Sequence, residues 1–208
     1  MIRFEDSKTP AEIVDADRRA ITDLVAVGAA NRALKAGDRM PTIVLPDSNG
    51  RTVESHDLLQ MGPVVVIFHR GIWCKCANHL LRAVEEVRAE IEARRASVVT
   101  ITQQIAANAR RARHLNGLGF PVLVDRGGEI AARFGVRWHM PAYLRDAYEI
   151  FDIDLARYNG EESWTLPMPA QFAVGTNGVI CYAEVDPDIM RPLDPRNVLP
   201  VLDRIRPL

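Results

Sequence analysis

The sequence has few cysteines, no long apolar run and almost no net charge, and each of these absences excludes a class of protein. Only three cysteines occur in 208 residues, too few for a scaffold held together by disulfides. No apolar run reaches the roughly 18 residues of a membrane-spanning helix. The formal net charge of −1 creates no overall field that would attract nucleic acid or an anionic membrane. We therefore expect neither a nucleic-acid partner nor a membrane protein.

The N-terminal stretch also lacks the apolar core of a secretory signal. It reads MIRFEDSKTPAEIVDADRRA and is charged from its first residues. The composition, 48% hydrophobic and 25% charged, is that of an ordinary globular domain. We expect a cytoplasmic protein, and in such a reducing compartment closely spaced cysteines more often bind metal or carry out redox chemistry.

The pattern of apolar residues predicts a helical N-terminal extension at residues 1–35 and one main domain at residues 36–208. In the main domain strands and helices alternate, and a hairpin follows near the end. Residues 137–168 read as irregular and rich in aromatic side chains. This order predicts an α/β three-layer sandwich, with a central mixed β-sheet flanked by helices. The predicted strands are 63–69, 97–102, 120–125, 170–174 and 179–185, and the longest helix is 74–95.

Cys74 lies where a buried strand is predicted to end and the long helix to begin. The change from strand to helix falls within residues 64–81, which read VVVIFHRGIWCKCANHLL. The free N–H groups and the dipole of a helix start stabilise a thiolate, and Arg70, Lys75 and a protonated His69 would act in the same direction. The sequence therefore predicts that Cys74 is a reactive nucleophile. The alternative is a buried cysteine that acts only as a small apolar residue.

Cys76 raises the questions of a disulfide and of a metal site. Residues two apart on a helix point about 200° apart, so two helical cysteines could bridge only if the first turn unwound. Cys76 therefore either resolves Cys74 or has no catalytic role. His69 and His79 would complete a set of four metal ligands with the two cysteines. Because Cys-x-Cys lacks the spacer usual in structural zinc sites, we predict no metal.

From about Ala33 to the C-terminus the chain resembles peroxiredoxin-like members of the AhpC/TSA family, which have the thioredoxin fold. Four stretches carry the resemblance in this order: LKAGDRMPTIVLPDSNGRTV, FHRGIWCKC, FPVLVDRGGEIAARFGV and NGEESWTLPMPAQFAVGTNGVICYAEVDPD. Together they imply a thioredoxin-like α/β sandwich. They also imply a thiol-dependent peroxidase that reduces hydrogen peroxide or organic hydroperoxides.

The resemblance assigns roles to individual residues. Cys74 corresponds to the peroxidatic cysteine, which is oxidised to a sulfenic acid and then restored by a thioredoxin- or glutathione-type reductant. Pro169 matches the cis-proline that faces the active cysteine, and its alternative is a trans proline that opens a strand. No cofactor is implied, and a homodimer stays open.

Three departures from the family pattern shape the alternatives. Ala77 stands where relatives of this type carry the second cysteine of Cys-x-x-Cys, and Gly71 stands where typical peroxiredoxins have a threonine. The arginine that normally precedes the late strand is replaced, and Arg70 is a candidate substitute, unless it is a solvated charge. The alternative functions are a thiol–disulfide oxidoreductase that uses Cys74 and Cys76, and a non-enzymatic or metal-binding protein.

Two further residues are candidates for the pocket around the thiol. Trp73 precedes Cys74 and either shields it from water or anchors the helix. Gln103 follows the strand at residues 97–102 and either lines the same edge of the sheet or lies on a surface loop.

Overall fold

Strand β3 (Val64–Phe68) is the middle of the sheet and is buried along its whole length. Its run of β-branched residues suits a strand that is covered on both faces. On one side β3 pairs in parallel with β4 (Ser97–Thr102), which pairs in parallel with β5 (Val122–Val124). On the other side it pairs antiparallel with β8 (Ala170–Val174), which pairs antiparallel with β9 (Ile180–Val185). The sheet is therefore mixed, as the sequence predicts.

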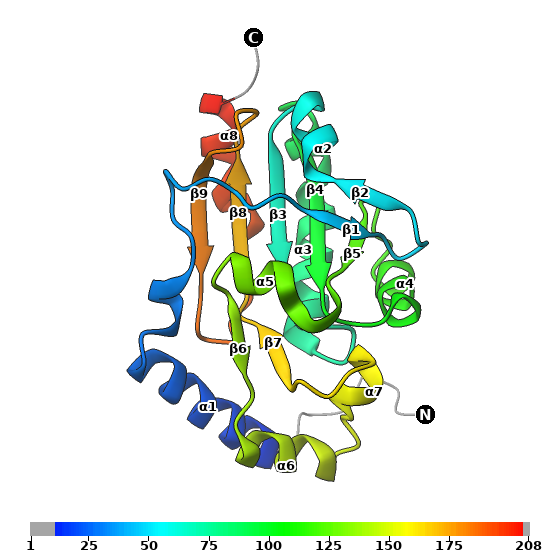
Figure 1. Cartoon of the computed structure of the whole chain (residues 1–208), viewed down its shortest axis with the longest axis vertical. Coiled ribbons are helices and arrows are strands. Elements are labelled where there is room, and N and C mark those ends of the chain that lie inside the picture. Colours follow the sequence, from blue (N-terminus) through cyan, green and yellow to red (C-terminus); the bar gives the residue numbers. More distant parts are fainter. Residues whose placement is uncertain (1–10, 206–208) are drawn as a thin grey trace.

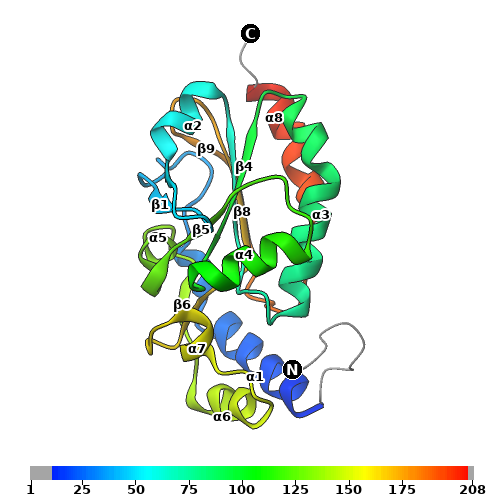
Figure 2. The same cartoon turned by 90° about the vertical axis from the view of Figure 1, so that its right-hand side faces the viewer.

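Helices cover both faces of this sheet in the computed structural model, which describes residues 11–205 (Figures 1 and 2). One face is covered by α3 (Lys75–Glu92), α4 (Ala106–Leu115) and α8 (Leu199–Ile205). The other face is covered by α2 (Ser55–Met61) and α5 (Glu129–Arg133). Alternate side chains of the central strand enter the two apolar clusters. The three-layer α/β sandwich is thus confirmed.

Shorter elements complete the main domain. Strand β1 (Val44–Pro46) pairs antiparallel with β2 (Thr52–Glu54) beside the five-stranded sheet. Three short 3₁₀ segments occur at Ala29–Arg32, Arg126–Gly128 and Pro195–Val198. Within residues 11–205 no helix is long and apolar enough to cross a membrane.

The prediction of an irregular segment at residues 137–168 is wrong. The segment contains β6 (Arg137–His139), α6 (Ala142–Ile150), α7 (Leu155–Asn159) and β7 (Thr165–Pro167), and β6 pairs antiparallel with β7. Each of these elements is three to nine residues long, so the apolar pattern is divided among pieces too short to show a period.

Helix α1 (Ala11–Ala26) packs against α6 beyond the end of the sheet where β3 and β4 finish (Figures 1 and 2). The two helices share a third apolar cluster, to which Leu24 and Leu144 contribute. The helical extension is therefore present, and it lies next to the edge of the sheet at which α/β proteins place their sites. The domain boundary at residue 36 stays a prediction.

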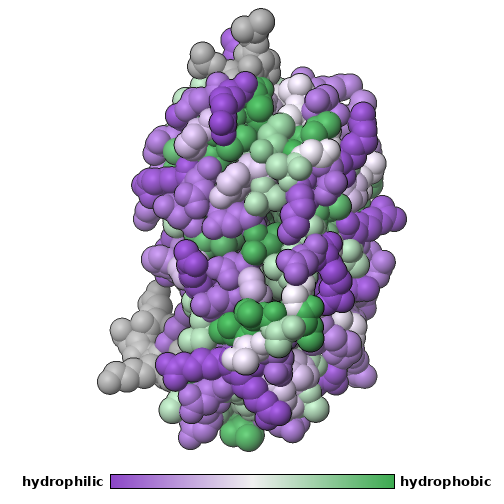
Figure 3. Space-filling model, turned by 90° about the vertical axis from the view of Figure 1, so that its left-hand side faces the viewer, coloured by the Kyte–Doolittle hydropathy of each residue, from purple (hydrophilic) through white to green (hydrophobic). Residues whose placement is uncertain are grey.

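Figure 3 shows the face of the molecule that carries α1 and the edge strand β9. Hydrophobic side chains emerge there in patches between hydrophilic ones. An edge strand presents free backbone groups to a neighbour, but an apolar patch alone does not identify a partner. The homodimer therefore stays a prediction.

Leu81 tests the packing that orients α3 against the sheet. Its side chain is 0% exposed and lies in the apolar cluster shared by α3, α4 and α8. We expect Leu81→Ala to lower the free energy of unfolding by about 2–5 kcal/mol, because it leaves a cavity in a close-packed core. Chemical denaturation measures the change. The control is Leu115→Ala, since Leu115 is 48% exposed; an equal loss in both variants would contradict this packing.

Candidate active site

A tight turn between β3 and α3 brings the candidate residues together. Gly71 has φ 146°, a backbone conformation that favours glycine, and a Cβ atom there would lie 2.7 Å from Cδ of Gln104. Gln104 is fully buried, and its Oε1 accepts a hydrogen bond of 2.9 Å from the backbone N–H of Ile72. The glycine and the buried glutamine therefore fix the turn from both sides. Sequence reasoning singled out Gln103 and missed its neighbour Gln104.

Cys74 is the N-cap of α3 and does not belong to its first turn. Its backbone is extended, with φ −91° and ψ 118°, and its sulfur accepts from the N–H of Ala77 at 3.4 Å. Asn78, also on the first turn, donates to the carbonyls of Ile72 at 2.6 Å and Cys74 at 2.9 Å. The sulfur thus caps a free backbone N–H at the positive end of the helix dipole, as a thiolate would.

Arg70 points its guanidinium at the sulfur of Cys74. Nη2 of Arg70 lies 3.1 Å from Sγ and also donates to the carbonyl of Ile189 at 3.0 Å. The alternative interpretation of a solvated charge is wrong, because Arg70 is only 4% exposed. Its guanidinium carbon lies 5.2 Å from the centroid of the Trp73 ring, which covers it on one side.

Two partners of Arg70 come from helices outside the turn. Nη1 of Arg70 donates to the hydroxyl of Tyr148 on α6 at 3.1 Å. That hydroxyl donates to Oδ1 of Asp17 on α1 at 2.7 Å, and Asp17 also forms an ion pair of 3.8 Å with Nη1. Sequence reasoning missed both residues. The signal for Asp17 was a carboxylate in the apolar stripe of α1, between Ile13 and Ala20.

The thiol of Cys76 faces the same cavity as Cys74, and a hydrogen bond that its proton can form to the Cys74 sulfur has the largest effect on the pKa of Cys74. The sequence analysis predicted that the two side chains point apart, on the assumption that both residues are helical. This prediction is wrong, because Cys74 is extended and only Cys76 is helical. The thiol also lies 3.0 Å from the carbonyl of Met190, and one S–H proton can serve only one of these two acceptors at a time. Both cysteines are free thiols.

The surroundings lower the pKa of Cys74 to about 6. The hydrogen bond from the Cys76 thiol is the largest cause, followed by the charge of Arg70 and the N–H of Ala77, while burial acts in the opposite direction. The hydrogen bond to Cys74, together with burial, raises the pKa of Cys76. Burial lowers the pKa of His69 to about 4, so this imidazole is neutral and the charge that we considered for it is absent.

A narrow cavity gives access to the sulfur of Cys74. Its volume of about 10 Å³ holds one water-sized molecule. The predicted pocket residues Trp73, Gly71 and Gln103 are not part of its wall. The wall consists of Phe68, His69, Arg70, Cys74, Cys76, Ala77, Leu80, Pro169, Ile189, Arg191 and Pro192.

Pro169 lines this cavity together with Cys74, but the predicted cis bond is wrong. No peptide bond between residues 11 and 205 is cis. Pro169 stands between β7 and β8, and its carbonyl accepts from the N–H of Asp186 at 3.1 Å. A trans proline fits here because it opens a strand at a position where no N–H is needed for pairing.

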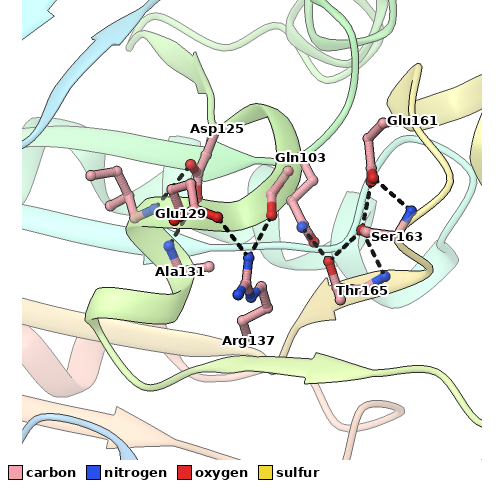
Figure 4. A network of polar contacts seen from close by, with 10 residues as sticks. Gln103, Asp125, Glu129, Ala131, Arg137, Glu161, Ser163 and Thr165 are labelled. Carbon is pink, nitrogen blue, oxygen red and sulfur yellow. Dashed lines mark hydrogen bonds and ion pairs between the residues drawn. The ribbon is translucent and has the colours of Figure 1, made fainter.

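Gln103 belongs to a separate polar network, drawn in Figure 4. It is 1% exposed, and its amide lies 2.9 Å from the hydroxyl of Thr165 on β7. In the same network Asp125 accepts from the first N–H groups of α5, and Arg137 pairs with Glu129 at 3.0 Å (Figure 4). Gln103 therefore ties the end of β4 to β7. The surface-loop role is wrong because Gln103 is buried; it lies at the edge of the sheet where β4 ends, but it does not line the cavity beside Cys74.

The four candidate metal ligands do not converge. His79 is exposed on α3, whereas His69 and the two cysteines face the cavity. In the part of the chain that the structure describes, no group of three or more His, Cys, Asp or Glu side chains is close enough to hold a metal ion.

Comparison with known proteins places this site in a family. Residues 36–183 match the AhpC/TSA family. A Mycobacterium tuberculosis protein named "Putative peroxiredoxin Rv1608c" is 32% identical over 108 residues, which are 50% of this chain and 68% of that protein. This chain therefore belongs to the AhpC/TSA family. With its free cysteines, membership defines a thiol-dependent peroxidase of the peroxiredoxin type, an antioxidant oxidoreductase.

Solved structures agree with the thioredoxin-like fold. Peroxidoxin BcpB from Mycobacterium tuberculosis has a TM-score of 0.65 at 21% identity and covers 84% of this chain and 99% of its own. A peroxiredoxin-like protein from Aquifex aeolicus has a TM-score of 0.64 at 16% identity, with 83% and 88% covered. A yeast mitochondrial 1-Cys peroxiredoxin has a TM-score of 0.59 at 14% identity, with 82% and 75% covered.

Arg70→Met tests the electrostatics of the site. We expect it to raise the pKa of Cys74 from about 6, because a charged hydrogen-bond donor is lost while burial stays. Alkylation by iodoacetamide across pH measures this pKa, since only the thiolate reacts. Trypsin cleaves after Lys75, so Cys74 and Cys76 are read on different peptides. Arg110→Met on α4 is the control, and an unchanged pKa in Arg70→Met would refute the role of Arg70.

Proposed function

We propose that Cys74 is the peroxidatic residue of this enzyme and that Arg70 stabilises its thiolate. The observation that carries the proposal is the contact of 3.1 Å between Nη2 of Arg70 and the sulfur of Cys74 at the start of α3. A buried guanidinium that touches a helix-capping sulfur favours the thiolate, and the thiolate is the nucleophile. Arg70 comes from the turn, and it takes the place of the arginine that the family carries before the late strand.

The first half-reaction oxidises Cys74 and reduces the peroxide. The thiolate attacks the terminal oxygen of a hydroperoxide, so that a sulfur–oxygen bond forms and the oxygen–oxygen bond breaks. Cys74 becomes a sulfenic acid. The leaving oxygen takes the bonding electron pair and a proton from water, which yields water or an alcohol. Arg70 is placed to donate to an oxygen that gains negative charge, in a buried site where such hydrogen bonds are strong.

In the second half-reaction an external thiol restores Cys74. One reductant thiol condenses with the sulfenic acid, releases water and forms a mixed disulfide; a second thiol attacks that disulfide and frees the Cys74 thiolate. The reductant leaves as a disulfide and has supplied two electrons. We propose a thioredoxin- or glutathione-type reductant. The yeast 1-Cys peroxiredoxin, described as resolved through the glutathione and thioredoxin systems, supports this choice.

The dimensions of the cavity favour a small substrate. About 10 Å³ of free volume beside Cys74 admits a molecule close to water in size. Hydrogen peroxide meets this limit, whereas a bulky organic hydroperoxide requires the segment at Ile189 and Pro192 to move. We therefore propose hydrogen peroxide as the preferred substrate.

A second candidate function follows from the contact between the two thiols. Cys76 hydrogen bonds to Cys74 and faces the same cavity, so it could attack the sulfenic acid or exchange with a disulfide substrate. The hydrogen bond to the Cys74 thiolate is the largest cause of the raised pKa of Cys76. Oxidation of Cys74 removes that thiolate, and Cys76 then loses its proton more easily. This would make the chain a thiol–disulfide oxidoreductase, or a peroxidase with an internal resolving thiol.

We also propose that the protein works in the cytoplasm. The three cysteines are free thiols, which a reducing compartment preserves. The homodimer expected from the sequence is kept as a proposal that sedimentation can test.

Cys74→Ser tests the main proposal. We expect it to reduce peroxide consumption, in the presence of a thiol reductant, to the rate without enzyme, because a serine hydroxyl is not ionised at neutral pH. Consumption is followed with hydrogen peroxide and either glutathione or a thioredoxin system. Cys181→Ser is the matched control, since Cys181 on β9 does not line the cavity, and it should retain the wild-type rate. Peroxide consumption by Cys74→Ser would overturn the proposal.

Treatment with one equivalent of peroxide distinguishes the two candidate functions. If an external thiol resolves Cys74, we expect the tryptic peptide that contains Cys74 to carry a sulfenic acid. Cys76→Ser should then keep most of its turnover, because the serine hydroxyl can still donate to the Cys74 sulfur. If Cys76 resolves Cys74, the two tryptic peptides are joined by a disulfide and Cys76→Ser accumulates sulfenic acid. Mass spectrometry without a reductant reads the result, and joined peptides would contradict the external route.

A further inference from the structure

Arg70 is held by a chain of polar groups that begins on helix α1. Burial alone would lower the pKa of Arg70, but its neighbours Cys74, Tyr148 and Asp17 raise it, so the guanidinium stays charged. A buried charge is strongly unfavourable unless partners surround it. Its immediate partners are therefore necessary for the charge that faces Cys74.

The two terminal nitrogens of Arg70 divide these partners between them. Nη2 donates to the sulfur of Cys74 at 3.1 Å and to the carbonyl of Ile189 at 3.0 Å. Nη1 serves the hydroxyl of Tyr148 at 3.1 Å. Because the guanidinium is planar and rigid, fixing Nη1 also fixes the direction of Nη2. The position of the Tyr148 hydroxyl therefore decides how well Arg70 meets the sulfur.

The Tyr148 hydroxyl is in turn held by Asp17. Its hydrogen bond to Oδ1 of Asp17 measures 2.7 Å, and the carboxylate is 6% exposed. A hydroxyl that donates to a carboxylate presents its lone pairs to the guanidinium, so Arg70 donates to Tyr148 and Tyr148 donates to Asp17. The carboxylate also forms an ion pair of 3.8 Å with Nη1 of Arg70.

Asp17 reaches this position because α1 docks on α6. Ile13, Ala20 and Leu24 form the apolar stripe that packs there, and Asp17 lies within the same stripe. Tyr148 packs edge-on against Trp73, with ring centroids 5.5 Å apart. The family match begins at residue 36, so Asp17 lies outside the part of the chain that the family describes.

We propose that Asp17 is a positioning residue of the active site, which acts through the Tyr148 hydroxyl to hold the Arg70 guanidinium against Cys74. The proposal rests on the function proposed above for Cys74. It makes α1 a component of the active site, whereas a helix that merely covered apolar surface would have no need of a buried carboxylate.

Under the proposal, the negative charge of Asp17 and its hydrogen bond with Tyr148 have opposite effects on the pKa of Cys74. The direction in which this pKa shifts in a variant therefore tests the proposal. The negative charge of Asp17 raises the pKa of Cys74. Under the proposal, the bond from Tyr148 to Asp17 acts in the opposite direction, because it holds Arg70 against the sulfur. Asp17→Asn removes the charge but keeps an accepting oxygen, whereas Asp17→Ala removes both. The other titratable or charged groups around Cys74 are His69, Arg70, Cys76, Tyr148, Asp188 and Arg191.

The experiment compares these two variants by alkylation of Cys74 across pH and by kcat/KM for hydrogen peroxide. We expect Asp17→Ala to raise the pKa of Cys74 by about one unit or more and to lower kcat/KM about tenfold or more, because Arg70 is displaced. We expect Asp17→Asn to leave the pKa at or below the wild-type value and to restore most of the rate. Asp15→Ala is the control on the same helix, since the Asp15 side chain is 74% exposed.

Tyr148→Phe supplies the same test independently of how well Asp17→Ala folds, since it removes only the bridging hydroxyl and keeps the ring. It should raise the pKa of Cys74 as Asp17→Ala does. In an Arg70→Met background, neither change should raise that pKa further, because the rise in both variants comes from the displacement of Arg70. An unchanged pKa in Asp17→Ala and Tyr148→Phe, or a full effect of either without Arg70, would overturn the proposal.

The two readouts separate this proposal from the function on which it rests. If the wild-type protein consumes no peroxide but the pKa of Cys74 shifts as expected in the variants, peroxidase function at Cys74 fails and the positioning role stands. If the wild-type protein consumes peroxide and the variants match it in pKa and rate, the positioning role fails and the function stands.

Discussion

The buried guanidinium of Arg70 is the constraint on which the rest of the site depends. A charged group that is 4% exposed is tolerated only with partners on every side, and these come from separate parts of the chain. Cys74 comes from the start of α3, Tyr148 from α6, Asp17 from α1 and the Ile189 carbonyl from the segment after β9. Each of these elements must be in place before Arg70 can face the sulfur. We therefore propose that the reactivity of Cys74 depends on the whole end of the sheet and not on the local motif alone.

Burial and reactivity are in conflict at Cys74, and short contacts resolve the conflict. Removal from water alone would raise the pKa of the thiol and make it inert. The Cys76 thiol, the Arg70 guanidinium and the N–H of Ala77 outweigh that effect because they act at hydrogen-bond distance in a place that water does not screen. A dry site also suits a reaction that produces a leaving oxyanion. Burial would make a cysteine without hydrogen-bond partners unreactive. With these partners in place, the same burial favours the reaction.

The sequence predicts what is local and misses what is distant. The order of strands and helices, the mixed sheet and the placement of Cys74 between β3 and α3 follow from short-range patterns, and they are confirmed. The contact between Tyr148 and Asp17 joins residues 131 apart, and no local pattern encodes such a pairing. The cis bond at Pro169 was carried over from the family, and it is wrong because the backbone here runs directly into β8. The prediction that the two thiols point apart is wrong because it assumed that Cys74 is helical.

The turn before Cys74 explains why this site cannot carry the family's threonine. Gly71 has φ 146°, and a Cβ atom would lie within 3.0 Å of both Gln104 and Trp73. Any side chain at this position would push away the glutamine that holds the N–H of Ile72. The path of the backbone thus leaves no room for the threonine side chain and its hydroxyl at position 71. Arg70, the residue directly before this glycine, is buried with its guanidinium 3.1 Å from the sulfur, so the turn that excludes one stabilising group stands beside the residue that supplies another.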